Sequence, residues 1–340
     1  MNRERKFLLG MMTGAAAILA GTAAVRNRRG IDFAGRVVVI TGGSRGLGLV
    51  LARRLAAEGA HLCLLARNET ELARAREELA GSPGEIMTVS CDIRRRADVR
   101  AAVDTVLERW SAIDVLINNA GVIQVGPLEH MTTQDFENAM ATHFWGPLHL
   151  MFESVPSMRR RGFGRIVNIT SIGGRVAVPH LAPYCASKFA LVGLSDGVRT
   201  ELAQYGIRVT TVTPGLMRTG SPLNVDVKGK HEAEYAWFVI SDSLPGFSTS
   251  AENAARQIVE ACRYGDSELT ITLPARIAVM ANNLAPRVVA RAMALANRLL
   301  PGPDGDRGDR RKSGRDSTSK WAPSAVTVLT DRAAAANNEL

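Results

Sequence analysis

The segment YCASK places a tyrosine and a lysine four residues apart, at Tyr184 and Lys188. On a helix this spacing puts both side chains on one face. A tyrosine with its ordinary pKa of about 10 is a poor base at neutral pH, but a nearby ammonium group favours the phenolate and lowers that pKa. Ser171 ends the apolar run IVNITS, where its hydroxyl could hold a carbonyl or alcohol oxygen. Together these three side chains could polarise a carbonyl group and exchange a proton with it.

A glycine-rich segment, TGGSRGLG at residues 41–48, follows the first apolar run and opens a helical pattern. Its glycines let the backbone turn sharply and approach a pyrophosphate, and the helix N-terminus offers N–H groups and the positive end of its dipole. We therefore predict a dinucleotide site here. The residues expected to contact the dinucleotide are Gly42, Ser44, Arg45, Gly46, Leu47 and Gly48.

The second apolar run ends in LLARNE, with Ala66 and Arg67 at the place where a site for NAD usually carries an acid for the ribose 2′-hydroxyl. Arg45 lies inside the glycine-rich segment. Two guanidinium groups without an acid suit a 2′-phosphate, which they can bind with paired hydrogen bonds. The sequence therefore favours NADP(H) over NAD(H) as the cofactor.

Short apolar runs alternate with helical patterns through the body of the chain. Helices are expected at 48–59 and 69–80, among other places. The runs with the character of buried parallel strands are RVVVI (36–40), HLCLL (61–65), IMTVS (86–90), DVLINN (114–119), RIVNIT (165–170) and RVTTV (208–212). This alternation predicts an α/β fold with a doubly wound parallel sheet and helices on both faces.

Over about residues 34–275 the chain resembles the short-chain dehydrogenase/reductase family. The motifs that carry the resemblance are TGxxxGxG at 41–48, CDI at 91–93, NNAG at 118–121, Ser171 placed 13 residues before YCASK, and PGLMRT at 214–219. The resemblance implies a Rossmann fold in one domain, predicted at 30–300, and an NADP(H)-dependent oxidoreductase acting on CH–OH groups. It also implies that Tyr184 is the acid/base, that Lys188 lowers its pKa and holds the nicotinamide ribose, and that Ser171 orients the substrate oxygen.

The same resemblance implies further cofactor contacts. Asp92 and Ile93 are expected to flank the adenine. The remaining contacts are Asn118, Ala120 and Gly121 beside the adenine ribose, and Pro214, Gly215 and Thr219 at the nicotinamide carboxamide. Ser187, by contrast, is interpreted as helix surface. The family commonly forms dimers or tetramers, so a homo-dimer or homo-tetramer is expected.

His143 marks a departure from the family pattern. The helix after NNAG carries, in the family, an asparagine in the form N-x-x-G, which supports a helix kink and a proton relay to the lysine. Here the pattern is His143-Phe-Trp-Gly146. Imidazole both donates and accepts hydrogen bonds and titrates near neutrality, so His143 could serve catalysis in that place. Alternatively, it only packs in the kink, and both interpretations stay open.

The N-terminal region, residues 1–29, has six Arg or Lys and one acid around an uncharged run of 19 residues at 7–25. The run is long enough to cross a hydrocarbon core of about 30 Å. We predict a membrane anchor. The denser charge after the run favours a catalytic domain that faces the cytoplasm. A cleaved signal peptide and a peripheral or disordered leader remain alternatives, and the alternative localisation is cytoplasmic.

Charge and composition bear on possible nucleic-acid binding, on disulfides and metal sites, and on disorder. The net charge of +9 is concentrated in residues 1–29, so no nucleic-acid partner is expected. Four cysteines without a CxxC pair predict neither a disulfide framework nor a metal site. The polar, Gly- and Pro-rich segment that opens residues 301–340 predicts a disordered tail.

Two further regions suggest what the protein binds: the predicted substrate pocket and a helix near the C-terminus. Residues around the predicted active centre make an apolar pocket plausible, and a lipophilic ketone, aldehyde or alcohol is the expected substrate. The residues considered for this pocket are Val176, Val178, Leu181, Trp237 and Phe238, although the aromatic pair could equally be core. Residues 287–300 form a basic amphipathic helix, which suits a membrane surface, a packed terminal helix or a dimer contact.

The main prediction is therefore a membrane-tethered NADP(H)-dependent oxidoreductase that interconverts a carbonyl and an alcohol. The alternative is a non-catalytic protein that senses NADP(H) or scaffolds a complex, which intact Ser171, Tyr184 and Lys188 argue against. A third option keeps the fold but performs epimerisation or dehydration.

Overall fold

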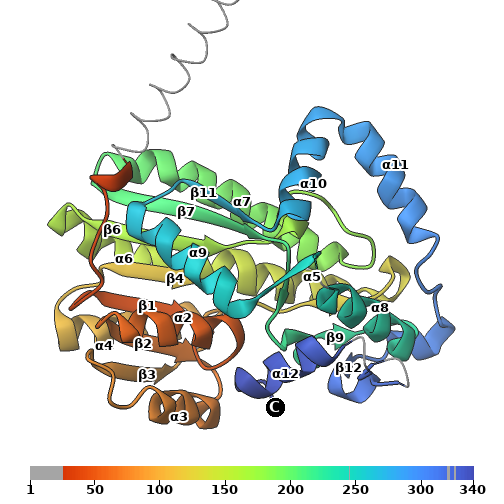
Figure 1. Ribbon diagram of the computed structural model, residues 1–340, viewed down its shortest axis with the longest axis horizontal. Coiled ribbons are helices and arrows are strands. Elements are labelled where there is room, and N and C mark those ends of the chain that lie inside the picture. Colours follow the sequence, from red (N-terminus) through yellow and green to blue (C-terminus); the bar gives the residue numbers. More distant parts are fainter. Residues whose placement is uncertain (1–25, 245, 320–321, 325–326) are drawn as a thin grey trace, which may run out of the picture.

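A seven-stranded parallel sheet forms the centre of the computed structural model, which describes residues 26–244, 246–319, 322–324 and 327–340 (Figure 1). The strand order is β11-β7-β6-β4-β1-β2-β3. The strands are β1 (Val37–Thr41), β2 (His61–Ala66), β3 (Ile86–Ser90), β4 (Val115–Asn118), β6 (Gly164–Ile169), β7 (Ile207–Pro214) and β11 (Glu268–Ile271). The predicted doubly wound parallel sheet is confirmed.

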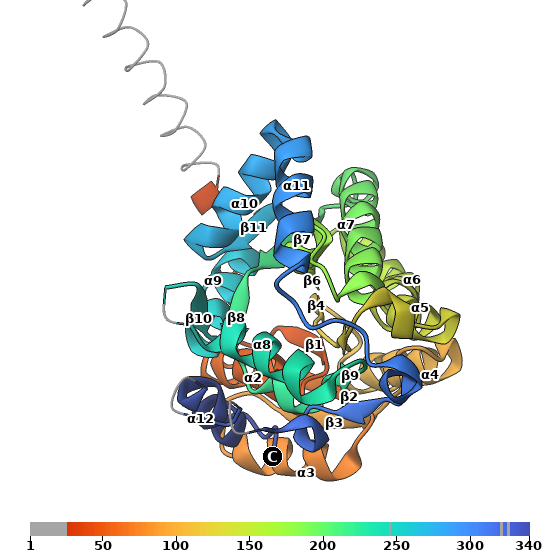
Figure 2. The same ribbon diagram turned by 90° about the vertical axis from the view of Figure 1, so that its right-hand side faces the viewer.

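Helices cover both faces of this sheet (Figures 1 and 2). Side chains alternate along each strand, so Val38 and Ile40 pack into one hydrophobic cluster while Val37 and Val39 pack into the other. The first cluster includes buried residues of α2 (Gly46–Ala57), α3 (Glu69–Glu78) and α9 (Ala251–Tyr264). The second includes residues of α4 (Arg96–Trp110), α6 (Gly146–Arg161) and α7 (Ala182–Ala203).

The remaining elements lie around the carboxyl edge of the sheet or belong to the C-terminal part of the chain. The helices are α5 (Thr133–Met140), α8 (His231–Ser243), α10 (Leu273–Leu284), α11 (Pro286–Asn297) and α12 (Val328–Ala336). The short strands are β5 (Gln124–Val125), β8 (Leu216–Arg218), β9 (Asp226–Val227), β10 (Ser248–Ser250) and β12 (Lys312–Ser313). The single-turn helices are η1 (Leu128–His130), η2 (Ala141–Trp145), η3 (Ile172–Gly174), η4 (Ser221–Asn224), η5 (Gly305–Asp309) and η6 (Arg315–Ser317).

Two features differ from the sequence prediction. The seventh strand, β11, was not predicted, because its sequence ELTI is short and opens with a charged residue at the edge of the sheet. Residues 301–340 were expected to be disordered, yet their described part forms regular elements. β12 pairs antiparallel with β9, and α12 packs against α8. These stabilising contacts come from distant parts of the chain, so the local polar composition gave no sign of them.

The predicted anchor at residues 7–25 lies outside the described residues. Within the part of the chain that the structure describes, no helix is long and apolar enough to cross a bilayer. All four cysteines are buried and unpaired.

Candidate active site

A cleft of about 720 Å³ opens at the carboxyl edge of the sheet. The glycine-rich segment before α2 lines one part of it, and Tyr184 and Lys188 of α7 line another. Most predicted site residues therefore share one cavity. The predicted residues that line it are Gly42, Ser44, Arg45, Gly46, Leu47, Arg67, Asp92, Ile93, Ala120, Gly121, His143, Tyr184, Lys188 and Thr219.

Five predicted residues do not line the cleft. They are Gly48, Asn118, Ser171, Pro214 and Gly215. Asn118 is buried in the sheet, where its amide donates to Asn168 Oδ1 at 2.8 Å, so it connects two strands and does not form a wall of the cleft. Its neighbour Asn119 lines the cleft instead, and its amide donates to the carbonyl oxygen of Thr41 at 3.0 Å. Both asparagines belong to one motif, and only their burial in the fold shows which of them faces the cleft.

Tyr184 and Lys188 lie in the first two turns of α7, which begins at Ala182 with Pro183 in its first turn. Lys188 is buried, and its Nζ donates to the carbonyl oxygen of Ile169 at 2.9 Å. The same nitrogen lies 5.7 Å from the centre of the Tyr184 ring. Ser171 is close enough to Tyr184 to share a side-chain hydrogen bond with it. The structure therefore brings together the three residues that the sequence nominated for proton exchange.

Burial dominates the electrostatics of this group. It raises the pKa of Tyr184 to about 12, although the hydrogen bond with Ser171 acts in the opposite direction. Burial also lowers the pKa of Lys188 to about 7. The sequence predicts that the Lys188 ammonium lowers the pKa of Tyr184, but in this structure burial raises that pKa instead. Tyr184 is held as a neutral phenol, which is the form that donates a proton.

His143 is completely buried in η2, a single π-helical turn between α5 and α6. Its Nε2 accepts the backbone N–H of Val122 at 3.1 Å, and its Nδ1 lies 2.7 Å from Ser187 Oγ. Because Nε2 accepts, Nδ1 carries the proton and donates to Ser187. Burial, followed by the charge of Lys188, lowers the pKa of His143 well below 6.5. The imidazole is neutral, and both of its nitrogens are occupied by the protein.

Ser187 was interpreted as helix surface, and that interpretation is wrong. Its side chain is fully buried, and its Oγ donates to the carbonyl oxygen of Tyr184 at 2.8 Å. The His143 ring also packs edge-on against the Tyr184 ring, with centroids 5.5 Å apart. A chain of contacts thus runs from the Val122 backbone through His143 and Ser187 to the first turn of α7.

The glycine-rich segment has the backbone shape that a phosphate-binding turn requires. Gly42 and Gly46 have φ values of +63° and +55°, which glycine adopts without strain. A side chain at Gly48 would overlap the carbonyl oxygen of Gly42, so only glycine fits there. The turn leads directly into α2, whose N-terminus has no side-chain cap. These features, with Arg45 and Arg67 beside them, fit a dinucleotide with a phosphorylated ribose.

Acidic groups surround Arg45 as well. Its guanidinium lies 3.4 Å from Glu71 Oε1 and 3.5 Å from Glu339 Oε2. Ser44 Oγ donates to the other oxygen of Glu71 at 2.9 Å. Arg67 is exposed at the rim of the cleft. The 2′-phosphate prediction from the sequence did not foresee either carboxylate.

Glu339 reaches this cleft from the C-terminal segment that was expected to be disordered. The amide N–H of Gly46 donates to the carbonyl oxygen of Asn337 at 2.8 Å, and Asn338 Nδ2 donates to the Ser44 carbonyl at 2.8 Å. Burial raises the pKa of Glu339 to about 7. No motif signals these contacts, because they join residues almost 300 positions apart.

Apolar side chains gather near Tyr184. Val178, Leu181, Trp237 and Phe238 belong to one hydrophobic cluster with the tyrosine ring, formed mainly by residues before α7 and within α8. Val176 is buried outside this cluster. The aromatic pair is only partly buried, so these residues are both core and candidate pocket wall.

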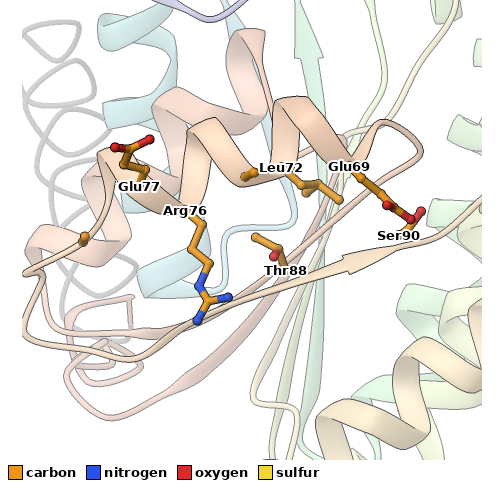
Figure 3. A pocket seen from close by; sticks show the side chains of 8 residues that line it. Glu69, Leu72, Arg76, Glu77, Thr88 and Ser90 are labelled. Carbon is orange, nitrogen blue, oxygen red and sulfur yellow. The ribbon is translucent and has the colours of Figure 1, made fainter.

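A second hollow, of about 570 Å³, lies between α3 and the edge strand β3 (Figure 3). Its lining includes Leu72, Arg76 and Thr88 and none of the predicted catalytic residues. Among the described residues, no cluster of three or more His, Cys, Asp or Glu side chains could hold a metal ion.

A profile of the short chain dehydrogenase family matches residues 36–227, which contain six of the seven central strands and the whole Ser171, Tyr184 and Lys188 group. The chain is a short-chain dehydrogenase. It thus belongs to a family of oxidoreductases with the Rossmann fold.

This short-chain dehydrogenase is similar to several known proteins. It is 33% identical over 265 residues to dehydrogenase/reductase SDR family member 7B of Bos taurus, covering 76% of this chain and 80% of the relative. It is 32% identical over 238 residues to the ketoacyl reductase HetN of a Nostoc species, covering 70% and 78%. Among solved structures, L-sorbose reductase from Gluconobacter frateurii, complexed with NADPH and L-sorbose, superposes with a TM-score of 0.64 at 27% identity, covering 71% of this chain and 97% of that one.

Proposed function

We propose that this short-chain dehydrogenase is an NADP(H)-dependent enzyme that interconverts a carbonyl and an alcohol. The observation that carries the proposal is that Tyr184 and Lys188 line the same cleft as the glycine-rich turn, with Ser171 within hydrogen-bond reach of Tyr184. Bound there, the nicotinamide would supply or accept the hydride.

In the proposed reduction, Ser171 and Tyr184 bind the carbonyl oxygen of the substrate. Tyr184 then donates its proton to that oxygen as negative charge develops on it. The raised pKa of the phenol suits this role, because the residue is protonated at neutral pH. Lys188 holds the ribose of the cofactor and lies close enough to the ring to stabilise the phenolate that remains.

His143 is proposed as a positioning residue. Neither of its ring nitrogens is available to a substrate, since Val122 and Ser187 occupy them. Through Ser187 it fixes the turn of α7 that carries Tyr184. His143 thus supports the helix kink that the family's asparagine supports. A direct proton relay through the imidazole is not proposed, because neither ring nitrogen is free.

NADP(H) is the proposed cofactor because Arg45 and Arg67 adjoin the position of a 2′-phosphate and no acid follows β2 directly. The likeness to an L-sorbose reductase solved with NADPH supports the same choice. The cofactor contacts proposed at Asp92, Ile93, Ala120, Gly121 and Thr219 agree with their place in the cleft lining.

A lipophilic substrate is proposed from the apolar cluster beside Tyr184. We further propose that residues 7–25 tether the protein to a membrane with the catalytic domain in the cytoplasm, and that the protein forms a homo-dimer or homo-tetramer. The uncharged run and its flanking charges support the tether.

The test is a turnover assay with the full-length protein, NADPH or NADH, and a panel of lipophilic and small polar carbonyls. We expect NADPH oxidation with lipophilic carbonyls and little with NADH. Turnover of small polar carbonyls alone would contradict the substrate class. Tight NADPH binding without turnover of any carbonyl would favour the alternative of a non-catalytic NADP(H) sensor or scaffold.

A further inference from the structure

Helices α10 and α11 form a hairpin that projects from the body of the molecule (Figures 1 and 2). No residue of α11 is buried, and Ala275 is the one buried residue of α10. Each helix contacts its partner on one side and leaves the other side exposed.

Each exposed side carries an apolar stripe. Leu273, Ile277, Met280 and Leu284 follow one another at the spacing of a single face of α10, and they are 53–80% exposed. On and just after α11, Val288, Leu295 and Leu299 repeat that spacing and are 61–85% exposed. Exposed apolar stripes of this kind mark a place where another surface binds.

The charge of the hairpin has one sign. No Asp or Glu lies between Glu268 and Asp304. The four arginines in this interval are Arg276, Arg287, Arg291 and Arg298. At about 100° per residue, the exposed Arg287, Arg291 and Arg298 group together on and just after α11, to one side of its apolar stripe, so the arginines flank the stripe. An apolar stripe flanked by arginines complements the acyl boundary and headgroups of an anionic bilayer.

The N-terminal sequence joins the body beside the same edge strand. Arg26 Nε lies 2.8 Å from Asp266 Oδ1, and its guanidinium stacks over the Tyr264 ring at 4.0 Å. Asp266 precedes β11, the edge strand that continues into α10. Arg26 directly follows the uncharged run at 7–25, so the sequence after that run joins the body beside the edge strand from which the hairpin departs.

We propose that the α10–α11 hairpin docks on an anionic lipid surface as a second membrane contact. The proposal rests on the proposed tether at residues 7–25. A second contact would fix the orientation of the catalytic domain on the membrane, which a single attachment point would not do. A hollow of about 750 Å³ separates the end of α11, at Arg298, from the loop at Val178 and His180 that leads to Tyr184. Docking would place this hollow at the lipid surface, where a lipophilic substrate is concentrated.

The test uses the full-length protein with a polarity-sensitive fluorophore on the new thiol of Leu295→Cys. The matched control carries the fluorophore on Glu77→Cys in α3, far from the hairpin in Figure 1. We expect a blue shift of the probe at position 295 with phosphatidylcholine–phosphatidylglycerol vesicles, none with phosphatidylcholine alone, and none at the control site. Replacing Arg291 and Arg298 by glutamate should abolish the shift.

Three outcomes would overturn the proposal. Co-sedimentation of the protein with vesicles while the probe at position 295 remains in water would leave the tether intact and exclude the hairpin. A shift that depends on protein concentration and needs no vesicles would identify a second copy of the chain as the occupant. A shift that survives both arginine replacements would exclude recognition of anionic lipid.

An independent observation concerns the C-terminal residues in the cleft. The Asn337 carbonyl accepts the hydrogen bond of the Gly46 N–H at the start of α2, and the carboxylate of Glu339 lies next to the Arg45 guanidinium. A phosphorylated cofactor would use those same two donors. Glu339 is only 3% exposed, and its Oε1 lies 2.5 Å from the point that a Cβ at Gly46 would take.

We infer that residues 337–339 compete with the cofactor phosphates and so set the affinity for NADP(H). The inference rests on the proposed cofactor. The segment is held by Asn224, whose amide donates to Glu339 Oε2 at 2.6 Å, and by Arg53, which donates to Asn337 Oδ1 at 2.9 Å. Both contacts would have to open before a phosphate could take the place of the carboxylate.

Fluorescence titration of NADPH into wild type, Glu339→Gln and the control Leu340→Ala tests this. The glutamine keeps the shape and loses the charge, so we expect a Kd about 5- to 10-fold lower than that of wild type, a typical coupling between sites. The control should match wild type, because Leu340 is exposed. Hydrogen exchange at residues 337–339 should become faster when NADPH binds.

An unchanged or higher Kd for Glu339→Gln, or slower exchange of the segment with NADPH, would contradict the competition. Failure of all three proteins to bind NADPH would instead contradict the proposed cofactor, and the competition with it.

Discussion

At the residue scale, the site combines a neutral phenol, a buried amine and a buried imidazole within one cluster of contacts. Sequence spacing nominated Tyr184, Lys188 and Ser171, and the structure brings them together. The state of charge could not be predicted, because it depends on how much protein covers each group and not on which residues are four apart.

Arg45 and Arg67 should decide the choice of cofactor. Replacing each by alanine should raise the KM for NADPH about 10- to 100-fold, since a hydrogen bond to a charged group contributes roughly 1.5–3 kcal/mol. The KM for NADH should stay unchanged. Arg74→Ala, on the exposed side of α3, is the matched control. An equal effect on both cofactors would contradict a 2′-phosphate contact.

His143 should behave as a positioning residue. His143→Ala removes the links to Val122 and Ser187 and should lower kcat about tenfold, whereas His143→Asn, which can still form hydrogen bonds, should keep most of the turnover. Because burial keeps the imidazole neutral, the pH profile should not change in either variant. A large loss in His143→Asn with a shifted profile would show that the imidazole has a chemical role of its own.

Lys188 should make stability depend on pH. Its pKa falls from 10.5 in the unfolded chain to about 7 in the fold, so between these values unfolding takes up a proton. The free energy of unfolding of wild type, relative to Lys188→Met, should therefore rise from about pH 7 to about pH 10. Urea denaturation across this range measures the difference, and a difference independent of pH would contradict a lowered pKa for the buried amine.

At the element scale, the turn before α2 depends on glycine at one position more than at others. Gly48→Ala would force its new methyl group into the Gly42 carbonyl, so it should lower the free energy of unfolding by about 1–3 kcal/mol and weaken NADPH binding. Gly193→Ala in α7 meets no atom within 4 Å and should be neutral or slightly stabilising. Unaltered NADPH binding by Gly48→Ala would contradict the proposed turn.

Elements were predicted best where local pattern and burial coincide. The six apolar runs became six central strands within one or two residues, because buried parallel strands are continuous apolar segments. Strand β11 escaped prediction because it lies at the edge and is partly exposed. The buried position of Ser187 also escaped, since its environment is built by η2 from another part of the chain.

At the scale of the whole molecule, the sequence predicts one catalytic domain at 30–300 with a segment on either side of it. The structure shows where the C-terminal segment packs. The C-terminal segment contributes β12 and α12 and reaches the glycine-rich turn. Its order comes from contacts across nearly the full length of the chain, and such contacts leave no trace in local composition. The hairpin of α10 and α11 was predicted only as one basic amphipathic helix, and its second apolar stripe became visible with the fold.

The central claim is that Tyr184 completes a reduction supported by NADPH. Incubation of the full-length protein with NADPH deuterated at the transferable position and a panel of lipophilic ketones, followed by mass spectrometry, tests it most directly. We expect wild type to place deuterium on the carbinol carbon of the product alcohol, and Tyr184→Phe to bind NADPH normally but yield no labelled alcohol. Labelled alcohol from Tyr184→Phe at the wild-type rate, or NADPH binding by wild type with no labelled product from any ketone, would contradict it.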